Sequence, residues 1–505
     1  EKNSGTVLLR IFLMTVLYFL FLYALPLLLP PSGCIMTFQQ KQLIDETRWT
    51  GTREVLSMSG PLILGMLSYT IMEFFDKVMC SYLGTDALAA VGSAGIASFT
   101  LCTLFMGIAS IVTTFVAQCF GREQYTLCAC YCWQGMYISV LGIFFAAVLW
   151  PLAPLLFGSM GHNETVTRYE LEYFRARVLG YFFVGAVTAL AGFFQSVSRP
   201  RIPMYAAIIA NASNLILNYL LIFGKFGFPR MEVAGAAVAT VLATILQFAI
   251  MLSFFLHRHF DSRYRTRASW AFDWHRLREM ITIGTPSAIS MFLDVANWWI
   301  FTAFIIGRFG AIQLAANTIA VSFIHICFLP AVGLNHGIAA IVGQWLGRRD
   351  VERAKRRTYT AIKIAGVYMV AMGITFALFG DTLISLIFRA EPEVVHLGHK
   401  LLILAALFQA FDAVNIVCTG ALKGAGDTHW MMYVTFVMSY LIFLPLALLF
   451  AFYFRMGAFG AWIGATVFII LLSGVLFRRF RKEGWRNINI FTRTAREGTS
   501  SAQGH

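Results

Sequence analysis

Four acidic residues lie within strongly apolar stretches of this chain: Glu73, Asp76, Asp294 and Asp412. An ionised carboxylate near the centre of a bilayer costs at least about 2.5 kcal/mol on insertion-based scales, so each acid needs a partner or a role. We expect no lysine or arginine at comparable depth, because Lys77 is close enough to a helix end to reach the interface. The interior charge is therefore predicted to be negative, which calls for a cation.

Asp76 has candidate partners elsewhere in the sequence. It lies about 12 Å from the end of its predicted helix, close to the bilayer midplane. Asn211, Asn214 and Asn218 are three and four residues apart and share one helix face, and Thr240 adds a hydroxyl group. Oxygen ligands of these kinds suit a hard cation, although hydrogen bonds between helices would use the same groups.

Glu73 precedes Asp76 by three residues, which is about one helical turn. Two carboxylates this close should not both be ionised in a medium of low dielectric constant, so we expect one of them to hold a proton. Glu73 is therefore a candidate proton relay.

The composition predicts the elements that position these residues. Of the 505 residues, 58% are hydrophobic and 13% are charged, whereas soluble domains have about 25% charged residues. Apolar runs long enough to span a bilayer recur along the chain. They predict twelve transmembrane helices, at residues 54–80, 87–119, 126–157, 172–197, 203–224, 233–256, 278–306, 312–345, 361–387, 397–422, 430–453 and 458–479.

An internal repeat groups these helices into two sets. Gln118 and Gly121 recur as Gln344 and Gly347, both 226 positions later. We therefore predict an all-α integral membrane protein with two pseudo-symmetric lobes of six helices, a substrate site between the lobes and alternating access. The predicted segments are an N-terminal segment (1–52), a first lobe (53–256), a basic cytoplasmic linker (257–276), a second lobe (277–480) and a basic cytoplasmic tail (481–505).

The second lobe carries different chemistry from the first. Position 302, which corresponds to Asp76 in the repeat, is Thr302, so neither Asp294 nor Asp412 is the repeat image of Asp76. We expect these two acids to bind substrate or a second cation. Trp298, close to Asp294, offers an aromatic face to an organic cation, but tryptophans near helix ends also anchor helices at the membrane interface.

The hydrophobic stretch at residues 7–29 fits neither lobe. The chain begins without a methionine, and Met36 is followed by a polar stretch of the kind found at cytoplasmic starts. We interpret residues 7–29 as upstream sequence from a misplaced start, as an extra helix or as a signal-like segment.

The net charge of +14 reflects membrane orientation. When the loops are assigned by alternation, 27 of the 39 Lys and Arg residues fall on one side, Arg177 being among those assigned to the other. This is the positive-inside pattern, which argues against a nucleic-acid partner and places both ends of the twelve-helix core in the cytoplasm. We expect a multi-pass protein of the cell (inner) membrane, monomeric within the lipid bilayer.

Several segments together resemble the multidrug and toxic compound extrusion (MATE) family over roughly residues 53–480. They are Gly60-Pro61, Phe75-Asp76-Lys77 with Leu83-Gly84, the segment from Asn214 to Asn218, the segment from Gly235 to Thr240, and the segment from Ala421 to Thr428. The resemblance implies a V-shaped antiporter that exports cationic, lipophilic compounds in exchange for sodium ions or protons, without a cofactor.

The resemblance also assigns roles to residues. Asp76, Asn214, Asn218 and Thr240 match the cation-binding positions of the family's first, fifth and sixth helices. Asn218 stands where the archaeal and DinF-like branch usually has Asp. Together with Asp294 and Asp412 at the acidic positions of the seventh and tenth helices, it is similar to the NorM branch. Lys77 replaces the commoner Thr or Ser and alters the charge beside Asp76.

Two other classes of protein, a membrane transferase and a lipid flippase, would require different residues. An integral-membrane transferase would need a paired-acid cluster or a set of metal-binding histidines, and the ten histidines form no such set. A flippase for lipids or lipid-linked precursors is the nearer alternative. A flippase for anionic precursors would require basic residues in its central cavity, whereas acids are predicted there.

Overall fold

The computed structural model describes residues 48–158, 160, 162–388, 391–486 and 488–491, which form helices joined by short loops. Residues 1–47, including the hydrophobic stretch 7–29, and tail residues 492–505 lie outside the described residues. The elements are α2 (Arg48–Ser81), α3 (Thr85–Ala109), α4 (Val112–Gly121), α5 (Tyr125–Ile138), α6 (Leu141–Gly158), α7 (Glu164–Val178), α8 (Tyr181–Ser196), α9 (Arg201–Phe223), α10 (Glu232–Phe255), α11 (Arg258–Tyr264), α12 (Trp274–Ile300), η2 (Phe301–Ile305), η3 (Ile306–Phe309), α13 (Ala311–Gly347), α14 (Val351–Ile387), α15 (Pro392–Ala425), α16 (Thr428–Phe436), η4 (Val437–Phe443), α17 (Leu444–Leu448), η5 (Leu449–Tyr453) and α18 (Gly457–Arg481).

The predicted number of membrane spans is confirmed, with one change in shape. Within the described residues, eleven continuous helical segments are long and apolar enough to cross a membrane; some join two elements, as Thr85–Gly121 joins α3 and α4. Helices α7 and α8 together make a twelfth span with a bend of 46°. The fourth predicted helix, 172–197, therefore begins earlier and is broken near Gly180. A Cβ at Gly180 would lie 2.9 Å from the side chain of Val241, so glycine allows α10 to approach at the bend.

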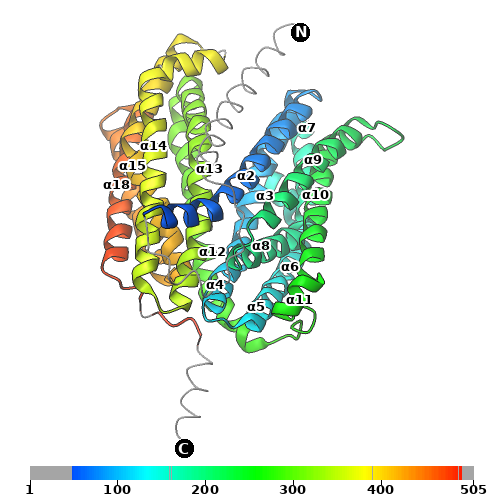
Figure 1. The fold of residues 1–505 in the computed structure, drawn as a ribbon. Helices are drawn as coiled ribbons and strands as arrows, with labels where there is room; N and C mark the ends of the chain where they lie inside the picture. The colour runs from blue at the N-terminus through cyan, green and yellow to red at the C-terminus, as the bar shows by residue number, and fades with distance from the viewer. Residues whose placement is uncertain (1–47, 159, 161, 389–390, 487, 492–505) are drawn as a thin grey trace, which may run out of the picture.

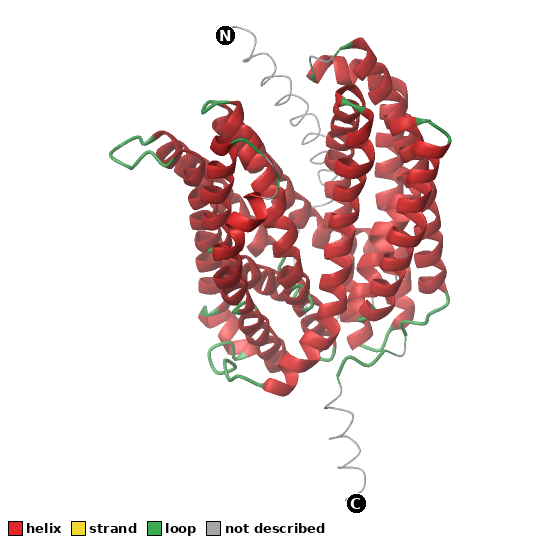
Figure 2. Cartoon of the chain, turned by 180° about the vertical axis from the view of Figure 1, so that it is seen from behind, coloured by secondary structure: helices red, strands yellow, loops and turns green. Residues whose placement is uncertain are grey.

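The helices form two bundles, which Figures 1 and 2 show from opposite sides. The end of α2 and helices α3 to α10 make the first bundle, the end of α12 and the elements from η2 to α18 make the second, and the two diverge toward the upper end of Figure 1. Each bundle has its own apolar core, built around Phe105, Phe174 and Phe193 in the first and around Phe301, Phe408 and Trp462 in the second. Helix α2 begins beside α13 and α14 and ends beside α9.

The bundles meet closely where α4 and α13 end. A Cβ at Gly121 would lie 2.1 Å from the carbonyl oxygen of Gln344, and a Cβ at Gly347 would lie 2.2 Å from that of Gln118. Since both distances are far below van der Waals contact, only glycine permits this approach at either position. The contact is symmetric because the two glycines are repeat equivalents.

The two glutamines of the repeat complete this contact. Gln118 Nε2 donates to the carbonyl oxygen of Gly424 in α15 at 3.2 Å, and Gln344 Nε2 donates to that of Ser196 in α8 at 2.7 Å. Both glutamine side chains are buried. The residues that revealed the repeat therefore also join the two bundles. We name the contact between Gln118, Gly121, Gln344 and Gly347 the glutamine latch.

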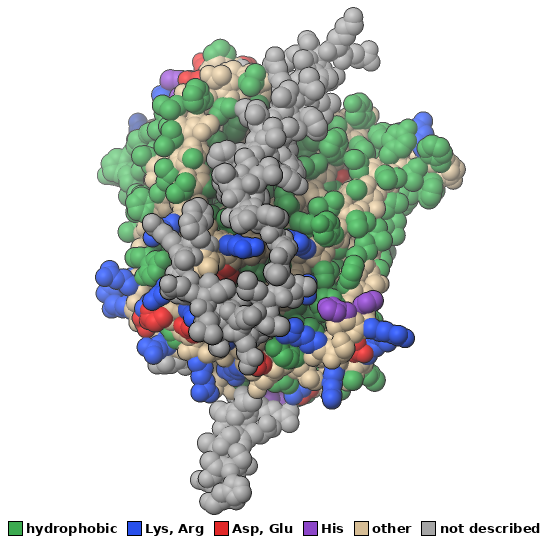
Figure 3. Space-filling view, in the orientation of Figure 1, with side chains coloured by type: hydrophobic (Ala, Val, Ile, Leu, Met, Phe, Trp, Pro, Cys, Tyr) green, Lys and Arg blue, Asp and Glu red, His purple; other side chains and the backbone are tan. Residues whose placement is uncertain are grey.

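The latch lies at the basic end of the molecule, which we define by the loops at residues 122–124, 257–273 and 348–350 and by tail residues 482–491. On the face seen in Figure 3, most Lys and Arg side chains gather in the lower half, whereas hydrophobic side chains dominate the upper half. Nearby, Glu54 of α2 accepts hydrogen bonds from Arg357 Nε at 2.5 Å and from Trp345 Nε1 at 3.1 Å. The basic end is therefore the closed end of the pair of bundles.

Candidate functional site

The four residues predicted as a cation site come together inside the first bundle. Asp76 is 8% exposed, Thr240 is 7% exposed, and Asn214 and Asn218 are fully buried. Asn218 Nδ2 donates to Asp76 Oδ1 and, at 2.9 Å, to Asn214 Oδ1. Asn214 Nδ2 lies 3.4 Å from Thr240 Oγ1. We name these four residues the Asp76 cluster.

Helix packing explains why these residues meet. Asn214 and Asn218 lie one turn apart on α9, which packs against both α2 and α10. Asp76 enters from α2 and Thr240 from α10, where its hydroxyl donates to the carbonyl oxygen of Ala236 at 2.9 Å. Asn211 faces another group, since its amide donates to Ser68 Oγ at 3.0 Å. Asn211 therefore shares a helix face with the other two asparagines but contacts Ser68 instead of Asp76.

The amide of Asn214 has two orientations with different consequences. One of its terminal atoms lies 2.9 Å from Asp76 Oδ1, and the other lies 3.2 Å from the backbone nitrogen of Thr240. If the nitrogen faces Asp76, it donates to the carboxylate. If the oxygen faces Asp76, two oxygens are in contact, and a proton or a metal cation is needed between them. Asn218 Oδ1 is also buried without a hydrogen-bond partner.

Glu73, the candidate proton relay, lies outside this amide cluster. Its side chain is exposed, and both Glu73 and Lys77 interact electrostatically with His325 of α13 in the other bundle. Glu73 also interacts electrostatically with Asp76. It is therefore placed between the solvent-accessible surface and the buried carboxylate, where a relay would need to be.

Arg177 corrects the expectation that no basic residue lies as deep as the acids. It is next to the bend between α7 and α8, near the middle of the fourth span. Its guanidinium interacts electrostatically with Asp76 and Tyr69, and its Nε is buried without a hydrogen-bond partner. Loop assignment from the apolar pattern placed Arg177 at the outer end because it missed the early start and the bend of this span.

The two acids of the second bundle differ in exposure. Asp294 on α12 is exposed, whereas Asp412 on α15 is 7% exposed. The two interact electrostatically, and Asn415 Nδ2 donates to Asp412 Oδ1 at 3.0 Å. Asp294 also interacts electrostatically with Tyr440, whose hydroxyl lies 3.5 Å from the carbonyl oxygen of Leu293. We name Asp294 and Asp412 the second-bundle pair.

Buried amides in the second bundle add to its polar interior. Both amide atoms of Asn297 and of Gln409 are buried without a hydrogen-bond partner. Gln409 lies one turn before Asp412 on α15, and Asn297 lies one turn after Asp294 on α12. No role was predicted for Gln409, although its helical spacing from Asp412 is a signal that could have identified it.

The aromatic residues near Asp294 divide between two environments. Trp298 packs into the core of the second bundle, with its ring 5.7 Å from those of Phe301 and Phe443. Trp299 is 47% exposed. Trp298 therefore has a packing role, whereas Trp299, five residues after Asp294 on the same helix, is accessible to a ligand.

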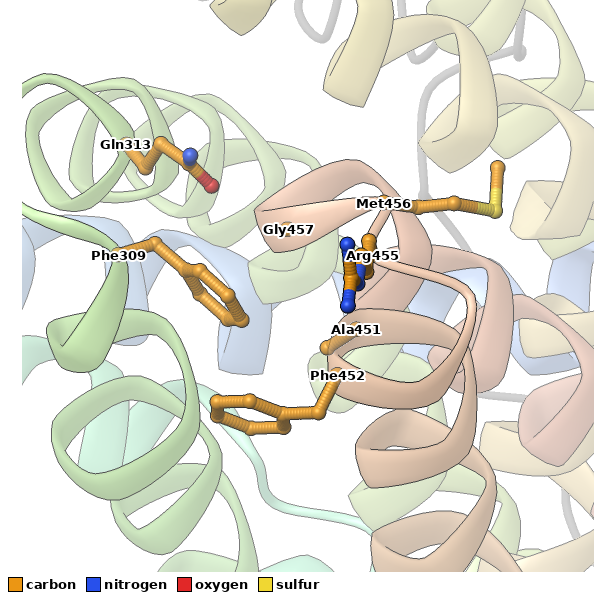
Figure 4. Close-up of a pocket in the computed structure, with 7 residues that line it drawn as sticks. All are labelled: Phe309, Gln313, Ala451, Phe452, Arg455, Met456 and Gly457. Atoms are coloured by element: carbon orange, nitrogen blue, oxygen red, sulfur yellow. The ribbon is translucent and has the colours of Figure 1, made fainter.

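A pocket of about 390 Å³ lies elsewhere in the second bundle, where η3, α13 and η5 meet. Figure 4 shows the side chains of Phe309, Gln313, Phe452 and Arg455 around it, together with Met456. No carboxylate lines it. It therefore lacks the group that the predicted cation chemistry requires, and we assign it no part in that chemistry.

Comparison with known proteins identifies the family. The sequence profile of the MatE family matches the chain twice, at residues 61–220 and 286–449. A probable multidrug resistance protein NorM from Mesorhizobium japonicum is 30% identical over 444 residues, which cover 85% of this chain and 93% of that protein. The multidrug resistance protein MdtK from Photorhabdus laumondii is 27% identical over 443 residues, with 86% and 95% covered.

Solved structures agree on the fold. A multidrug resistance MATE family transporter of the MOP superfamily, in an outward-facing conformation, aligns with a TM-score of 0.80 at 20% identity, covering 87% of this chain and 97% of the other. A MOP superfamily transporter from Pyrococcus furiosus aligns with a TM-score of 0.79 at 21% identity, covering 86% and 95%. From the two profile matches and the two bundles, we conclude that this chain belongs to the MatE family of membrane transporters.

Proposed function

We propose that this transporter is a multidrug antiporter that exports lipophilic cations in exchange for a sodium ion or a proton. The observation that carries this proposal is the Asp76 cluster, in which one buried carboxylate is surrounded by neutral amides and a hydroxyl group. A permanent partner such as a paired lysine would close such a site to ions. An arrangement of exchangeable neutral donors leaves it able to load and release a small cation.

The ligands around Asp76 favour sodium. A proton needs only the carboxylate, whereas a sodium ion needs several oxygens. Asn218 now points its nitrogen at Asp76 while its oxygen is buried and unpartnered. A half-turn of the Asn218 amide would replace a donor with an oxygen ligand beside Asp76, and the Asn214 oxygen lies 2.9 Å from Asp76 Oδ1 in one of its two orientations. The same four side chains could thus hydrogen-bond the carboxylate without the ion and coordinate the ion when it is bound.

The second-bundle pair is suited to a larger cation. Asp294 is exposed, so an organic cation can reach it without displacing a packed core. Tyr440 interacts electrostatically with Asp294, and an aromatic face attracts a cation within about 6 Å of its centroid. The relatives named as multidrug resistance proteins support a drug as the substrate.

Alternating access fits the positions of the two bundles. They are in contact at the basic end through the glutamine latch. If the positive-inside rule holds for this chain, the basic end faces the cytoplasm, and the structure is open to the outside. Export then requires the latch to separate so that substrate can enter from the cytoplasm. A single chain supplies both bundles, which agrees with a monomer in the cell membrane.

The test is efflux of a fluorescent lipophilic cation from proteoliposomes under a sodium gradient and under a pH gradient, each imposed alone. We expect the sodium gradient to stimulate efflux at constant pH. Efflux that depends on the pH gradient alone would assign the Asp76 cluster to a proton. A lack of response to both gradients would refute cation-coupled antiport.

A further inference from the structure

The basic end contains a pocket that the proposed transport reaction does not use. It has a volume of about 850 Å³, within the range of small-molecule sites. Its lining contains four arginines, three amides and no acid: Gln118, Arg122, Gln124, Leu346, Gly347, Arg348, Arg349, Val351, Arg486, Ile488 and Asn489.

The arginines come from three separate parts of the chain. Arg122 follows α4 in the first bundle, Arg348 and Arg349 join α13 to α14 in the second, and Arg486 belongs to the segment after α18. The segment after α18 is held by its apolar residues, because Phe491 packs into the first-bundle core. A molecule in this pocket would therefore contact both bundles and the tail at once.

Two of the guanidinium groups lie over aromatic rings. Arg122 Cζ is 4.2 Å from the ring centroid of Phe491, and Arg348 Cζ is 4.6 Å from that of Trp345. These cation–π contacts restrict the positions of both guanidinium groups. A guanidinium group can bind a phosphate through two parallel hydrogen bonds.

The acids around the pocket offset only part of its charge. Glu483 Oε2 lies 3.5 Å from Arg486 Nη1, but Glu483 Oε1 also lies 2.6 Å from Lys355 Nζ, so its charge is shared. Glu54 and Glu123 interact electrostatically with Arg348. Desolvation lowers the pKa of Arg122, with a further contribution from the charge of Arg349. Desolvation also lowers the pKa of Arg348. Positive charge is thus crowded and partly removed from water, a situation that a bound anion relieves.

We propose that this arginine pocket binds an anion that carries a phosphate group with at least two negative charges. A soluble phosphate compound or the head group of an anionic lipid would supply this chemistry, since arginine binds phosphate groups and basic pockets at a membrane surface bind anionic lipid head groups. Because the pocket joins both bundles beside the glutamine latch, binding would hold the basic end closed. This consequence rests on the proposed alternating access, whereas the binding itself does not.

The experiment measures binding by the purified chain in a neutral detergent at low ionic strength. Inorganic pyrophosphate and dioctanoyl phosphatidic acid are titrated separately by calorimetry, with dioctanoyl phosphatidylcholine as the zwitterionic control. The variant Arg349→Gln/Arg486→Gln removes two exposed arginines from the pocket. The variant Arg478→Gln removes an exposed arginine from the last turn of α18, outside the pocket.

We expect the parent to bind at least one of the two anions, and the double variant to bind it at least about tenfold more weakly because two charge-assisted contacts are lost. Arg478→Gln should bind as the parent does. Binding of pyrophosphate would indicate a soluble ligand, and binding of phosphatidic acid alone a lipid. The proposal is wrong if neither anion binds at millimolar concentrations, or if both variants weaken binding equally. These outcomes are independent of transport, so they do not depend on the proposed function.

Discussion

The two bundles arise from one repeat, yet their acidic sites differ. In the first bundle, Asp76 is buried and satisfied by neutral amides from a neighbouring helix. In the second, Asp294 is exposed, and Asp412 accepts its hydrogen bond from Asn415 of its own helix. The latch shows the opposite behaviour, because there the repeat has kept identical residues in equivalent contacts.

This difference indicates which parts of a duplicated protein are free to change. The latch joins one bundle to the other, so a change on one side must fit the backbone of its repeat equivalent. Each acidic site belongs to one bundle and can change without affecting the other. The following predictions test this division between a coupling site at the Asp76 cluster, a drug site at the second-bundle pair and the glutamine latch that joins the two bundles.

The largest effect is expected from Asp76→Asn. This change removes the charge but keeps the shape, so the variant should insert normally and lose gradient-driven efflux down to the level of empty liposomes. Efflux of a fluorescent cation from proteoliposomes measures the loss. Glu393→Gln, which neutralises an exposed acid in the first turn of α15, is the control and should transport as the parent does. Unchanged gradient dependence in Asp76→Asn would remove this residue from the mechanism.

Asp294→Asn and Asp412→Asn should separate the two sites. We expect each to weaken export of cationic drugs more than it weakens sodium binding to the Asp76 cluster, because the acids belong to different bundles. Drug efflux and sodium-induced thermal stabilisation, measured on the same preparations, compare the two effects. If either variant loses sodium binding as completely as Asp76→Asn, the division into two sites is wrong.

Asn218→Ala tests whether the amides are ligands or only structural. Alanine removes the amide oxygen that would coordinate the ion, and a contact to a charged group contributes about 1.5–3 kcal/mol, so the apparent sodium affinity should fall by at least about tenfold. Any proton-driven component should change less. Efflux as a function of sodium concentration at constant pH gives the affinity. Asn211→Ala is the matched control, because this residue contacts Ser68 instead of Asp76. Equal effects of the two changes would make the asparagines structural.

Gly121→Ala and Gly347→Ala test the glutamine latch. The added methyl group would overlap a backbone carbonyl at 2.1 Å or 2.2 Å, and overpacking of this kind costs about 1–3 kcal/mol. Both variants should open the basic end to similar extents, seen as faster hydrogen exchange in α4 and at the end of α13. Gly366→Ala has nothing within 4 Å of its added Cβ and should leave exchange unchanged. A large effect from only one of the latch glycines would contradict the symmetry.

The sequence by itself determined the class of protein, the number of spans and the members of the Asp76 cluster. Apolar runs of sufficient length must cross the membrane because lipid cannot hydrogen-bond an open backbone. The spacing of Asn214 and Asn218 placed them on one helix face, since helical periodicity is a local property. Their residue types made them and Thr240 candidate partners of Asp76, the family resemblance selected them over Asn211, and the structure brings all four together.

Only the tertiary structure decided which polar residues meet across distant segments. Local pattern did not indicate that Arg177 interacts with Asp76, because that position depends on a bend between α7 and α8. The residues Gln118 and Gln344 were visible as a repeat, but their role as a latch follows from how closely glycine lets the bundles approach. The arginine pocket likewise depends on a tail that folds back onto the first bundle. Helical periodicity fixes the face on which a residue lies, whereas the packing of helices far apart in the chain fixes what that face contacts.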